Sequence, residues 1–202
     1  MKVVHVETLI KKGKFSQSKI WDELLISIIK EVEDVDWPTG SGKFTIYPES
    51  GKGRGMGNGV KPIKDSFIKR LIIQGWEKEK PLDIASRKKP GNLDLLLEIE
   101  NKKIAIEWET GNISSTHRAL NKMALGLVKG IIEVGILILP SRNLYKYLTD
   151  RIGNFDEIEP YLDLWRSIII ISGILIIIVI EHDDESRNVK KIPKGTDGRA
   201  LN

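Results

Sequence analysis

LDLLLEIENKKIAIEWETGN, residues 93–112, is the stretch of sequence that decides the fold. Residues 93–99 and 103–109 are strand-like runs, and the polar pair Asn101 and Lys102 between them predicts a tight turn, so the stretch is typical of an antiparallel hairpin. In the second run apolar residues alternate with Ala105, Glu107 and Glu109. Because successive side chains of a strand point to opposite faces, one face of this hairpin is apolar and the other is acidic.

Three carboxylates share the acidic face. With Asn101 and Lys102 as the turn, Asp94 lies directly opposite Glu109, and Glu107 lies on the diagonal. Directly opposed side chains are about 5 Å apart at Cβ, and diagonal ones lie within about 8 Å. Negative charges this close oppose folding unless a cation lies among them, and Mg²⁺ is typically held by one or two carboxylates with waters and substrate phosphates. The hairpin therefore predicts a magnesium site that serves phosphate chemistry.

An ordinary half-buried hairpin with its charged face in water fits the same alternation. The cluster also depends on the turn, because a turn of odd length would move Asp94 to the other face. The spacing alone leaves both interpretations open.

The rest of the chain predicts an α/β protein with a mixed central sheet flanked by helices. Apolar residues recur at helical spacing over residues 20–32, 63–76 and 113–129, and the segment EKEKP at 77–81 is expected to end the second helix. The stripe on the helix at 113–129 faces either the core of its own chain or a partner. We expect further buried strands at residues 134–139 and within the isoleucine-rich segment 168–180. Residues 1–202 show no internal repeat and no linker, which indicates a single domain.

Alternate glycines occupy the segment 51–59, where they are separated by Lys52, Arg54, Met56 and Asn58. No Gly-Lys-Ser or Gly-Lys-Thr follows the run, so it is not a Walker motif. We expect a mobile surface loop here, with a phosphate-binding loop as the alternative.

The composition limits the choice of metal and of compartment. The chain has no cysteine and three scattered histidines, so a metal would be bound by oxygen atoms, which favours Mg²⁺, Mn²⁺ or Ca²⁺. The net charge of +4 permits a nucleic-acid partner without requiring one. The N-terminus lacks the apolar core of a signal peptide, and segment 168–180 is shorter than the roughly 20 apolar residues that cross a bilayer. We therefore expect a cytoplasmic protein.

The acidic strand leads directly into the start of the helix at residue 113. Asn112, Ser114, Ser115 and Arg118 gather there, and unpaired backbone N–H groups at a helix start attract anions. Asparagine, serine and arginine also read base edges in a major groove. Any one of Asn112, Ser114 and Ser115 could instead be the helix N-cap.

Several longer blocks make the chain resemble the BamHI family of type II restriction endonucleases. These blocks are EKPLDI (79–84), EWETGNISSTHRALNK (107–122), YLTDRIGNFDEIEPY (147–161) and IPKGTDG (192–198), with weaker similarity around FTI (44–46) and VKPIK (60–64). They occur in the family's order and nearly with its spacing, and together they span almost the whole chain.

The resemblance implies a variant of the PD-(D/E)xK nuclease core in which a glutamate replaces the usual lysine. In this family Asp94 would be the bridging metal ligand, Glu107 and the carbonyl of Trp108 further ligands, Glu109 the residue that activates the water, and Glu79 the remaining carboxylate. The implied reaction is phosphodiester hydrolysis with two Mg²⁺ ions that leaves 5′-phosphate ends. Mn²⁺ would substitute for Mg²⁺, whereas Ca²⁺ would bind without supporting cleavage.

The resemblance also implies a DNA site and partners. The site would be the palindrome GGATCC, cut on both strands by a homodimer in which the helix at 113–129 forms part of the interface. A cognate DNA methyltransferase would protect the host. The residues implied to read the bases are Asn112, Ser114, Arg118, Asp150 and Arg151. Lys64 and Lys122 are candidates for phosphate contacts, and Gly195 and Asp197 for minor-groove contacts.

Two other functions remain open from the sequence. A nuclease of the same core could degrade or repair DNA without site specificity, and a DNA-binding regulator could carry the carboxylates only as a solvated strand face. The block at residues 112–118 and the pair Asp150 and Arg151 favour the site-specific enzyme.

Overall fold

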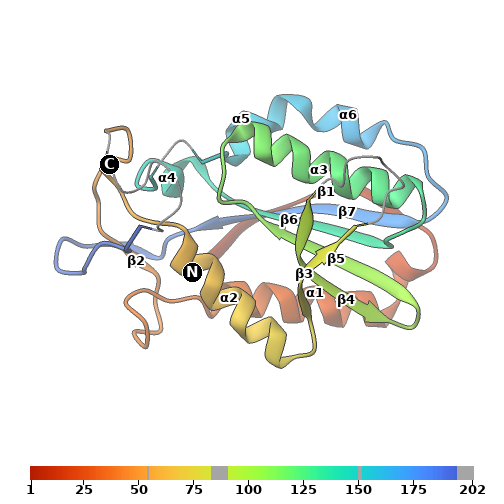
Figure 1. The fold of residues 1–202 in the computed structure, drawn as a ribbon, viewed down its shortest axis with the longest axis horizontal. Coiled ribbons are helices and arrows are strands. Elements are labelled where there is room, and N and C mark those ends of the chain that lie inside the picture. Colours follow the sequence, from red (N-terminus) through yellow and green to blue (C-terminus); the bar gives the residue numbers. More distant parts are fainter. Residues whose placement is uncertain (54, 83–90, 150–151, 195–202) are drawn as a thin grey trace.

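A six-stranded mixed sheet lies between two layers of helices (Figure 1). The computed structural model describes residues 1–53, 55–82, 91–149 and 152–194. The strand order is β1-β7-β6-β5-β4-β3, in which β5, β6 and β7 are parallel and the other neighbours are antiparallel. The strands of this sheet are β1 (Lys2–Lys12), β3 (Glu77–Pro81), β4 (Asn92–Ile99), β5 (Lys102–Trp108), β6 (Val134–Pro140) and β7 (Gly173–Glu181).

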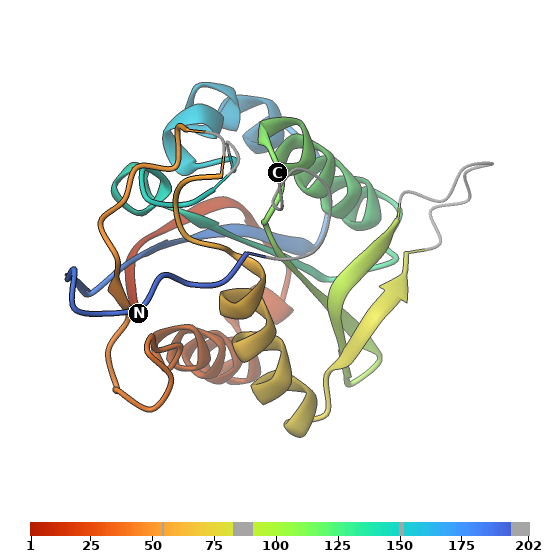
Figure 2. The ribbon, with the colours of Figure 1, turned by 60° about the vertical axis from the view of Figure 1, so that its left-hand side comes forward.

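The helices divide between the two faces of the sheet. Helices α1 (Lys19–Glu33) and α2 (Lys61–Ile73) cover one face, and α3 (Ile113–Val128), α5 (Phe155–Ile158) and α6 (Leu162–Arg166) cover the other, as Figures 1 and 2 show. Helix α4 (Arg142–Tyr145) follows β6, and a two-stranded sheet joins β2 (Thr45–Ile46) to β8 (Asp184–Glu185). Two short 3₁₀ turns, Phe15–Gln17 and Glu159–Tyr161, precede α1 and α6.

Each face has its own apolar core. Trp21, Ile28 and Phe67 of α1 and α2 belong to the cluster that contains the Ile104 face of β5, whereas Leu120 and Met123 of α3 belong to the cluster on the opposite face. Strands β6 and β7 are buried on both faces, which accounts for their nearly uninterrupted apolar sequences VGILILP and GILIIIVIE.

The predicted fold class and most predicted elements are confirmed. The helices α1, α2 and α3 and the strands β4, β5, β6 and β7 lie where the periodicity indicated. Three details differ. Residues 77–81 form the edge strand β3, the N-terminal β1 was not expected, and the isoleucine-rich segment enters β7 only at Gly173, so that Ile169 and Ile171 are exposed. No helix in the described ranges combines the length and apolarity that a bilayer crossing needs.

The turn of the hairpin lies one residue earlier than the sequence predicted, which changes the pairing. Ile99 pairs with Lys102, so the two turn residues are Glu100 and Asn101, and both have positive φ, 49° and 61°. The register therefore shifts by two residues. Because the shift is even, the faces are as predicted, but Asp94 continues the register opposite Glu107 and not opposite Glu109.

The glycine segment is only partly a surface loop. Its tip is exposed, but Gly57, Asn58 and Gly59 are buried, and their backbone is hydrogen-bonded to residues around 147 and 192. The expectation of a mobile surface loop is thus wrong for the second half of the segment, because tertiary contacts hold it.

Candidate functional site

The carboxyl end of β5 and the start of α3 enclose a polar cavity of about 570 Å³. Strand β4 supplies one wall, α2 contributes Lys64, and α3 covers the cavity with four residues of its first three turns. The ionisable residues that line the cavity are Lys64, Asp94, Glu107, Glu109, Arg118 and Lys122. The structure therefore brings all three carboxylates of the acidic face to one place.

Asp94 is held from two directions. Its Oδ2 accepts a hydrogen bond from the backbone N–H of Trp108 at 2.8 Å, and its Oδ1 pairs with Lys64 Nζ at 2.5 Å. The first contact fixes the carboxylate against the neighbouring strand. The second supplies one positive charge from the helix layer on the other face of the sheet.

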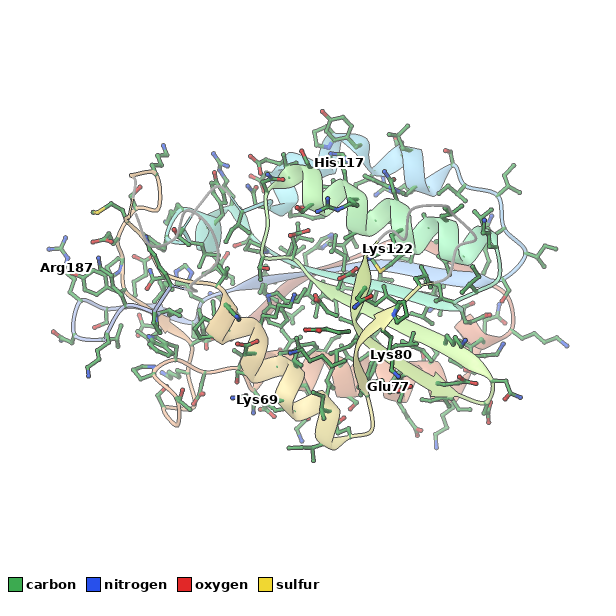
Figure 3. All side chains as sticks on the ribbon, in the orientation of Figure 1. Lys69, Glu77, Lys80, His117, Lys122 and Arg187 are labelled. Carbon is green, nitrogen blue, oxygen red and sulfur yellow. The ribbon has the colours of Figure 1, made fainter. Side chains whose placement is uncertain are left out.

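Glu107 is buried and faces Lys122 of α3. The lysine, itself only 7% exposed, forms an ion pair with the carboxylate and also donates a hydrogen bond to the carbonyl of Asn92 at 2.8 Å. Figure 3 shows Lys122 below α3, on the side toward the strands. Burial raises the pKa of Glu107 to about 7, with a further rise from the charge of Asp94, and Lys122 opposes this rise.

Glu109 lies just past the end of β5, where its backbone N–H still bonds to the carbonyl of Ile138 at 2.9 Å. Its Oε1 accepts a hydrogen bond from the N–H of Gly111 at 2.5 Å. Burial raises the pKa of Glu109, and hydrogen bonds from the N–H groups of Gly111 and Thr110 partly offset the rise. In the sequence, only the glycine that closely follows the strand pointed to these two amides.

Of the four carboxylates predicted to bind the metal or activate the water, all of which the structure describes, only Glu79 does not line the cavity. It falls at the register position of β3 opposite Asp94, but its φ is 54°, it is exposed, and it pairs with Lys78 at 3.4 Å. Its expected part in metal binding stays a prediction.

The start of α3 lies at the mouth of the cavity. Asn112 is the N-cap, whose side chain accepts from the N–H of Ser115 at 3.2 Å. Ser115 and Arg118 line the cavity and are joined by a hydrogen bond of 3.1 Å. Asn112 and Ser114 line a second cavity of about 540 Å³, together with Lys52 of the glycine segment.

Four predicted residues lie outside the described residues, namely Asp150, Arg151, Gly195 and Asp197. Among the predicted phosphate contacts, Lys64 and Lys122 instead meet the carboxylates.

The donor set suits a hard divalent cation. The side chains of Asp94, Glu107 and Glu109 offer only oxygen, two of them are desolvated, and they repel one another, which a dication would relieve. Within the part of the chain that the structure describes, no three acidic or histidine side chains are yet close enough to enclose a metal, and Lys64 and Lys122 occupy the space beside two of the carboxylates. Mg²⁺ fits such a site, since it needs only one or two carboxylates.

Comparisons with known proteins agree on one family. The family model "Restriction endonuclease BamHI" matches residues 1–199. The type II restriction enzyme OkrAI of Oceanobacter kriegii is 46% identical over 201 residues, which cover all of both chains. The type II restriction enzyme BamHI of Bacillus amyloliquefaciens is 40% identical over 197 residues, 94% of this chain and 86% of that relative.

A solved structure supports the fold. The crystal structure of restriction endonuclease BglII complexed with a DNA 16-mer aligns with a TM-score of 0.60 over 91% of this chain and 79% of that chain. At 10% identity this likeness concerns the fold alone.

Proposed function

The chain belongs to the BamHI family of restriction endonucleases and is a type II restriction enzyme, and from this premise we propose that it cuts both strands of GGATCC at the Asp94–Glu107–Glu109 cavity. The observation that supports this site most strongly is that two desolvated carboxylates, Glu107 and Glu109, line the same cavity as the N-terminus of α3. Carboxylates attract a divalent cation, and the helix start attracts a phosphate.

Enzymes of this family use a divalent metal, and the proposed ion is Mg²⁺. Asp94, Glu107 and the carbonyl of Trp108 would hold it, with Glu79 as a further carboxylate. Two bound ions would make the attacking water more acidic and offset the charge of the phosphate. Mn²⁺ would replace Mg²⁺, whereas Ca²⁺ would bind without supporting cleavage.

The protein's own groups have separate tasks in this proposal. Glu109 accepts the proton of the water, and its raised pKa makes it a better base than an ordinary carboxylate. The N–H of Gly111 keeps one of its oxygens in place at 2.5 Å. Lys64 and Lys122 pair with the carboxylates in the protein without DNA, and in this proposal they would contact phosphate when DNA is bound.

In this proposal the residues around the start of α3 recognise the DNA bases. An arginine such as Arg118 or Arg151 pairs with the O6 and N7 of guanine, an aspartate such as Asp150 accepts from the cytosine amino group, and Asn112 and Ser114 complete the contacts. Gly195 and Asp197 are the proposed minor-groove contacts. GGATCC is the site expected from the family.

A palindrome is cut symmetrically by a two-fold dimer, so the proposed active form is a homodimer. Helices α3 and α6 support this, because they lie side by side and leave apolar side chains exposed (Figure 1). Their contacts include a ring contact of His117 with Trp165 at 5.6 Å and a hydrogen bond from Trp165 Nε1 to Asn121 at 3.0 Å, and His117 also contacts the ring of Tyr161, in the 3₁₀ turn before α6, at 4.9 Å. The exposed side chains are Leu125 and Val128 of α3, Leu164 of α6, and Tyr161 of the 3₁₀ turn that precedes α6.

Three further features complete the proposal. Residues 1–202 form one endonuclease domain, the enzyme works in the bacterial cytoplasm, and a cognate DNA methyltransferase protects the host DNA. The last follows from the chemistry, since a GGATCC endonuclease would otherwise cut the genome of its own cell.

The test is digestion of a plasmid of known sequence with Mg²⁺, followed by sequencing of the fragment ends. Discrete fragments cut within GGATCC support the proposal, a smear indicates a non-specific nuclease, and no cleavage indicates a regulator. Asp94→Asn and Glu109→Gln should each reduce the cleavage rate by about a thousandfold or more while site-specific binding of GGATCC persists.

Glu98→Gln is the matched control, because Glu98 is exposed on the same face of β4, four residues from Asp94. This variant should cut at the wild-type rate. Full activity of Asp94→Asn and Glu109→Gln would refute the assigned site.

A further inference from the structure

The glycine segment is hydrogen-bonded to two parts of the chain that are far apart in sequence. We call residues 51–53 and 55–59 the glycine strap. Gly51 N–H donates to the carbonyl of Lys146 at 2.9 Å, Asn58 N–H to that of Tyr147 at 2.8 Å, and Gly59 N–H to that of Ile192 at 2.9 Å. In return the N–H of Thr149 donates to the carbonyl of Asn58 at 2.8 Å.

These contacts require glycine, because the backbones approach closely. A Cβ on Gly51 would lie 1.7 Å from the carbonyl oxygen of Leu148, and one on Gly59 would lie 2.0 Å from that of Pro193. Gly57 has a φ of 82°, and a Cβ there would lie 2.7 Å from the Cα of Gly51. Backbone packing therefore accounts for Gly51, Gly57 and Gly59 without a phosphate ligand.

Asn58 is the centre of the glycine strap. It has no exposed surface, and its side chain makes three hydrogen bonds. The Nδ2 group donates to the carbonyls of Tyr47 at 2.8 Å and Tyr147 at 3.0 Å, and Oδ1 accepts from the N–H of Ile192 at 3.1 Å. One buried amide thus joins three segments, and the removal of its side chain would leave buried backbone groups unpaired, which is unfavourable.

The joined segments lead directly to the proposed base-reading residues. Thr149, which bonds to Asn58, immediately precedes Asp150 and Arg151, and Ile192 lies three residues before Gly195. Directly after the dipeptide Asp150–Arg151 in the sequence, Ile152 pairs with Asn112, and Gly153 N–H donates to the carbonyl of Gly111 at 2.9 Å. The described residues that flank the dipeptide are thus anchored to the glycine strap on one side and to the α3 start on the other.

We propose that Asn58 is a positioning residue for site selectivity, which holds the segments that carry the base-reading residues although it is too deeply buried to touch DNA. The inference rests on the proposed function, because it takes the reading role of the residues next to Thr149 and Ile192 from there. Loss of Asn58 leaves the Asp94–Glu107–Glu109 cavity intact and loosens the reading segments. Discrimination between sites should fall more than the rate of cutting.

The experiment compares kcat/KM for a duplex with GGATCC and for duplexes with one base pair changed, with Mg²⁺ and well below the unfolding temperature. A wrong base pair weakens a well-fitted interface by about 5- to 150-fold, so Asn58→Ala should lower the ratio of the two kcat/KM values by about tenfold. Ile28→Ala is the control for stability, because it also empties a buried position, in α1 and outside the glycine strap. It should lower the unfolding temperature and leave the ratio unchanged.

A milder variant guards against failure of Asn58→Ala to fold. Glu49 braces the glycine strap from outside, where its Oε2 accepts from Gly57 N–H at 2.9 Å and pairs with Lys191 Nζ at 2.5 Å. Glu49→Ala should reduce the ratio in the same direction by a smaller factor.

The outcomes separate the two proposals. A wild-type enzyme without preference for GGATCC refutes the proposed site and the inference with it. A selective wild-type enzyme whose ratio is unchanged in every Asn58 and Glu49 variant that folds overturns the inference alone. A ratio that falls equally in Ile28→Ala overturns it too, because the effect would then follow from stability.

Discussion

Lys122→Met tests the electrostatics of the candidate site directly. Lys122 is the positive charge nearest to Glu107, and both side chains are buried. Methionine has a similar length, so it fills the space and removes mainly the charge and the hydrogen bond to the carbonyl of Asn92. At high pH the substitution leaves an ionised carboxylate in the interior without its partner.

The expected loss depends on pH through Glu107. Its pKa in the folded protein is about 7, above the ordinary 4.5, so the protonated form stabilises the fold at low pH, and this contribution is lost as the pH rises through 7. At pH 8 the wild-type carboxylate is ionised and paired, and breaking such a buried pair costs about 3–5 kcal/mol. At pH 5.5 the carboxyl is protonated in both proteins. The substitution then costs about 1 kcal/mol of unfolding free energy, the contribution of one hydrogen bond.

The assay is urea unfolding followed by tryptophan fluorescence, at pH 5.5 and pH 8, without divalent metal. Wild type, Lys122→Met, Glu107→Gln and the double variant form a double-mutant cycle. The free energy of unfolding should fall by about 3 kcal/mol for Lys122→Met at pH 8, and by about 1 kcal/mol at pH 5.5 or in the Glu107→Gln background. Equal losses at both pH values and in both backgrounds would refute the assigned pair.

Three further predictions concern the metal, the packing of α3 and the dimer. Below pH 7 the affinity for Ca²⁺, measured by calorimetry, should fall about tenfold per pH unit, because the ion needs an ionised Glu107; a flat profile from pH 5.5 to 7 contradicts this. Gly135→Ala should lower the free energy of unfolding by about 1–3 kcal/mol in urea, since its Cβ would lie 2.9 Å from the Cβ of Met123; an unchanged midpoint would show that α3 moves away freely. Leu164→Asp should shift sedimentation toward the monomer, whereas Ile26→Asp, equally exposed but on α1, should not; a dimer that survives Leu164→Asp places the interface elsewhere.

The acidic face of the hairpin could be predicted because its cause is local. Alternation in β5 fixes which side chains share a face, whatever the neighbouring strand does. The register could not be predicted, because it depends on which two residues accept positive φ, and Glu100 was a poor candidate beside Asn101. The predicted register was wrong by two residues. The three carboxylates still share one face, but Asp94 lies opposite Glu107 and not opposite Glu109.

The edge strands and the glycine strap depend on contacts that no local pattern contains. Strand β3, EKEKP, has no β-branched residues and no alternation of apolar with polar residues. It is a strand because it pairs with β4 at the edge of the sheet. The glycine strap bonds to residues about 90 and 130 positions away, so its glycines resembled an ordinary loop until those backbones were in place. Lys64 likewise reaches Asp94 from α2, which only the packing of the helix layer determines.

Gly111 links the proposed base-reading segment to the proposed base. Its N–H donates to Glu109 Oε1 at 2.5 Å, and its carbonyl accepts from Gly153 N–H at 2.9 Å, so one residue contacts both. A Cβ at this position would lie 3.0 Å from Glu109 Oε1 and 2.8 Å from Ser115 Oγ, which excludes any larger residue without movement of one of them. A shift of residues 152–153 would therefore pass through a single residue to the carboxylate that receives the proton. We accordingly expect a wrong base pair to slow the cleavage step itself, in addition to weakening binding, because the same residue holds both parts.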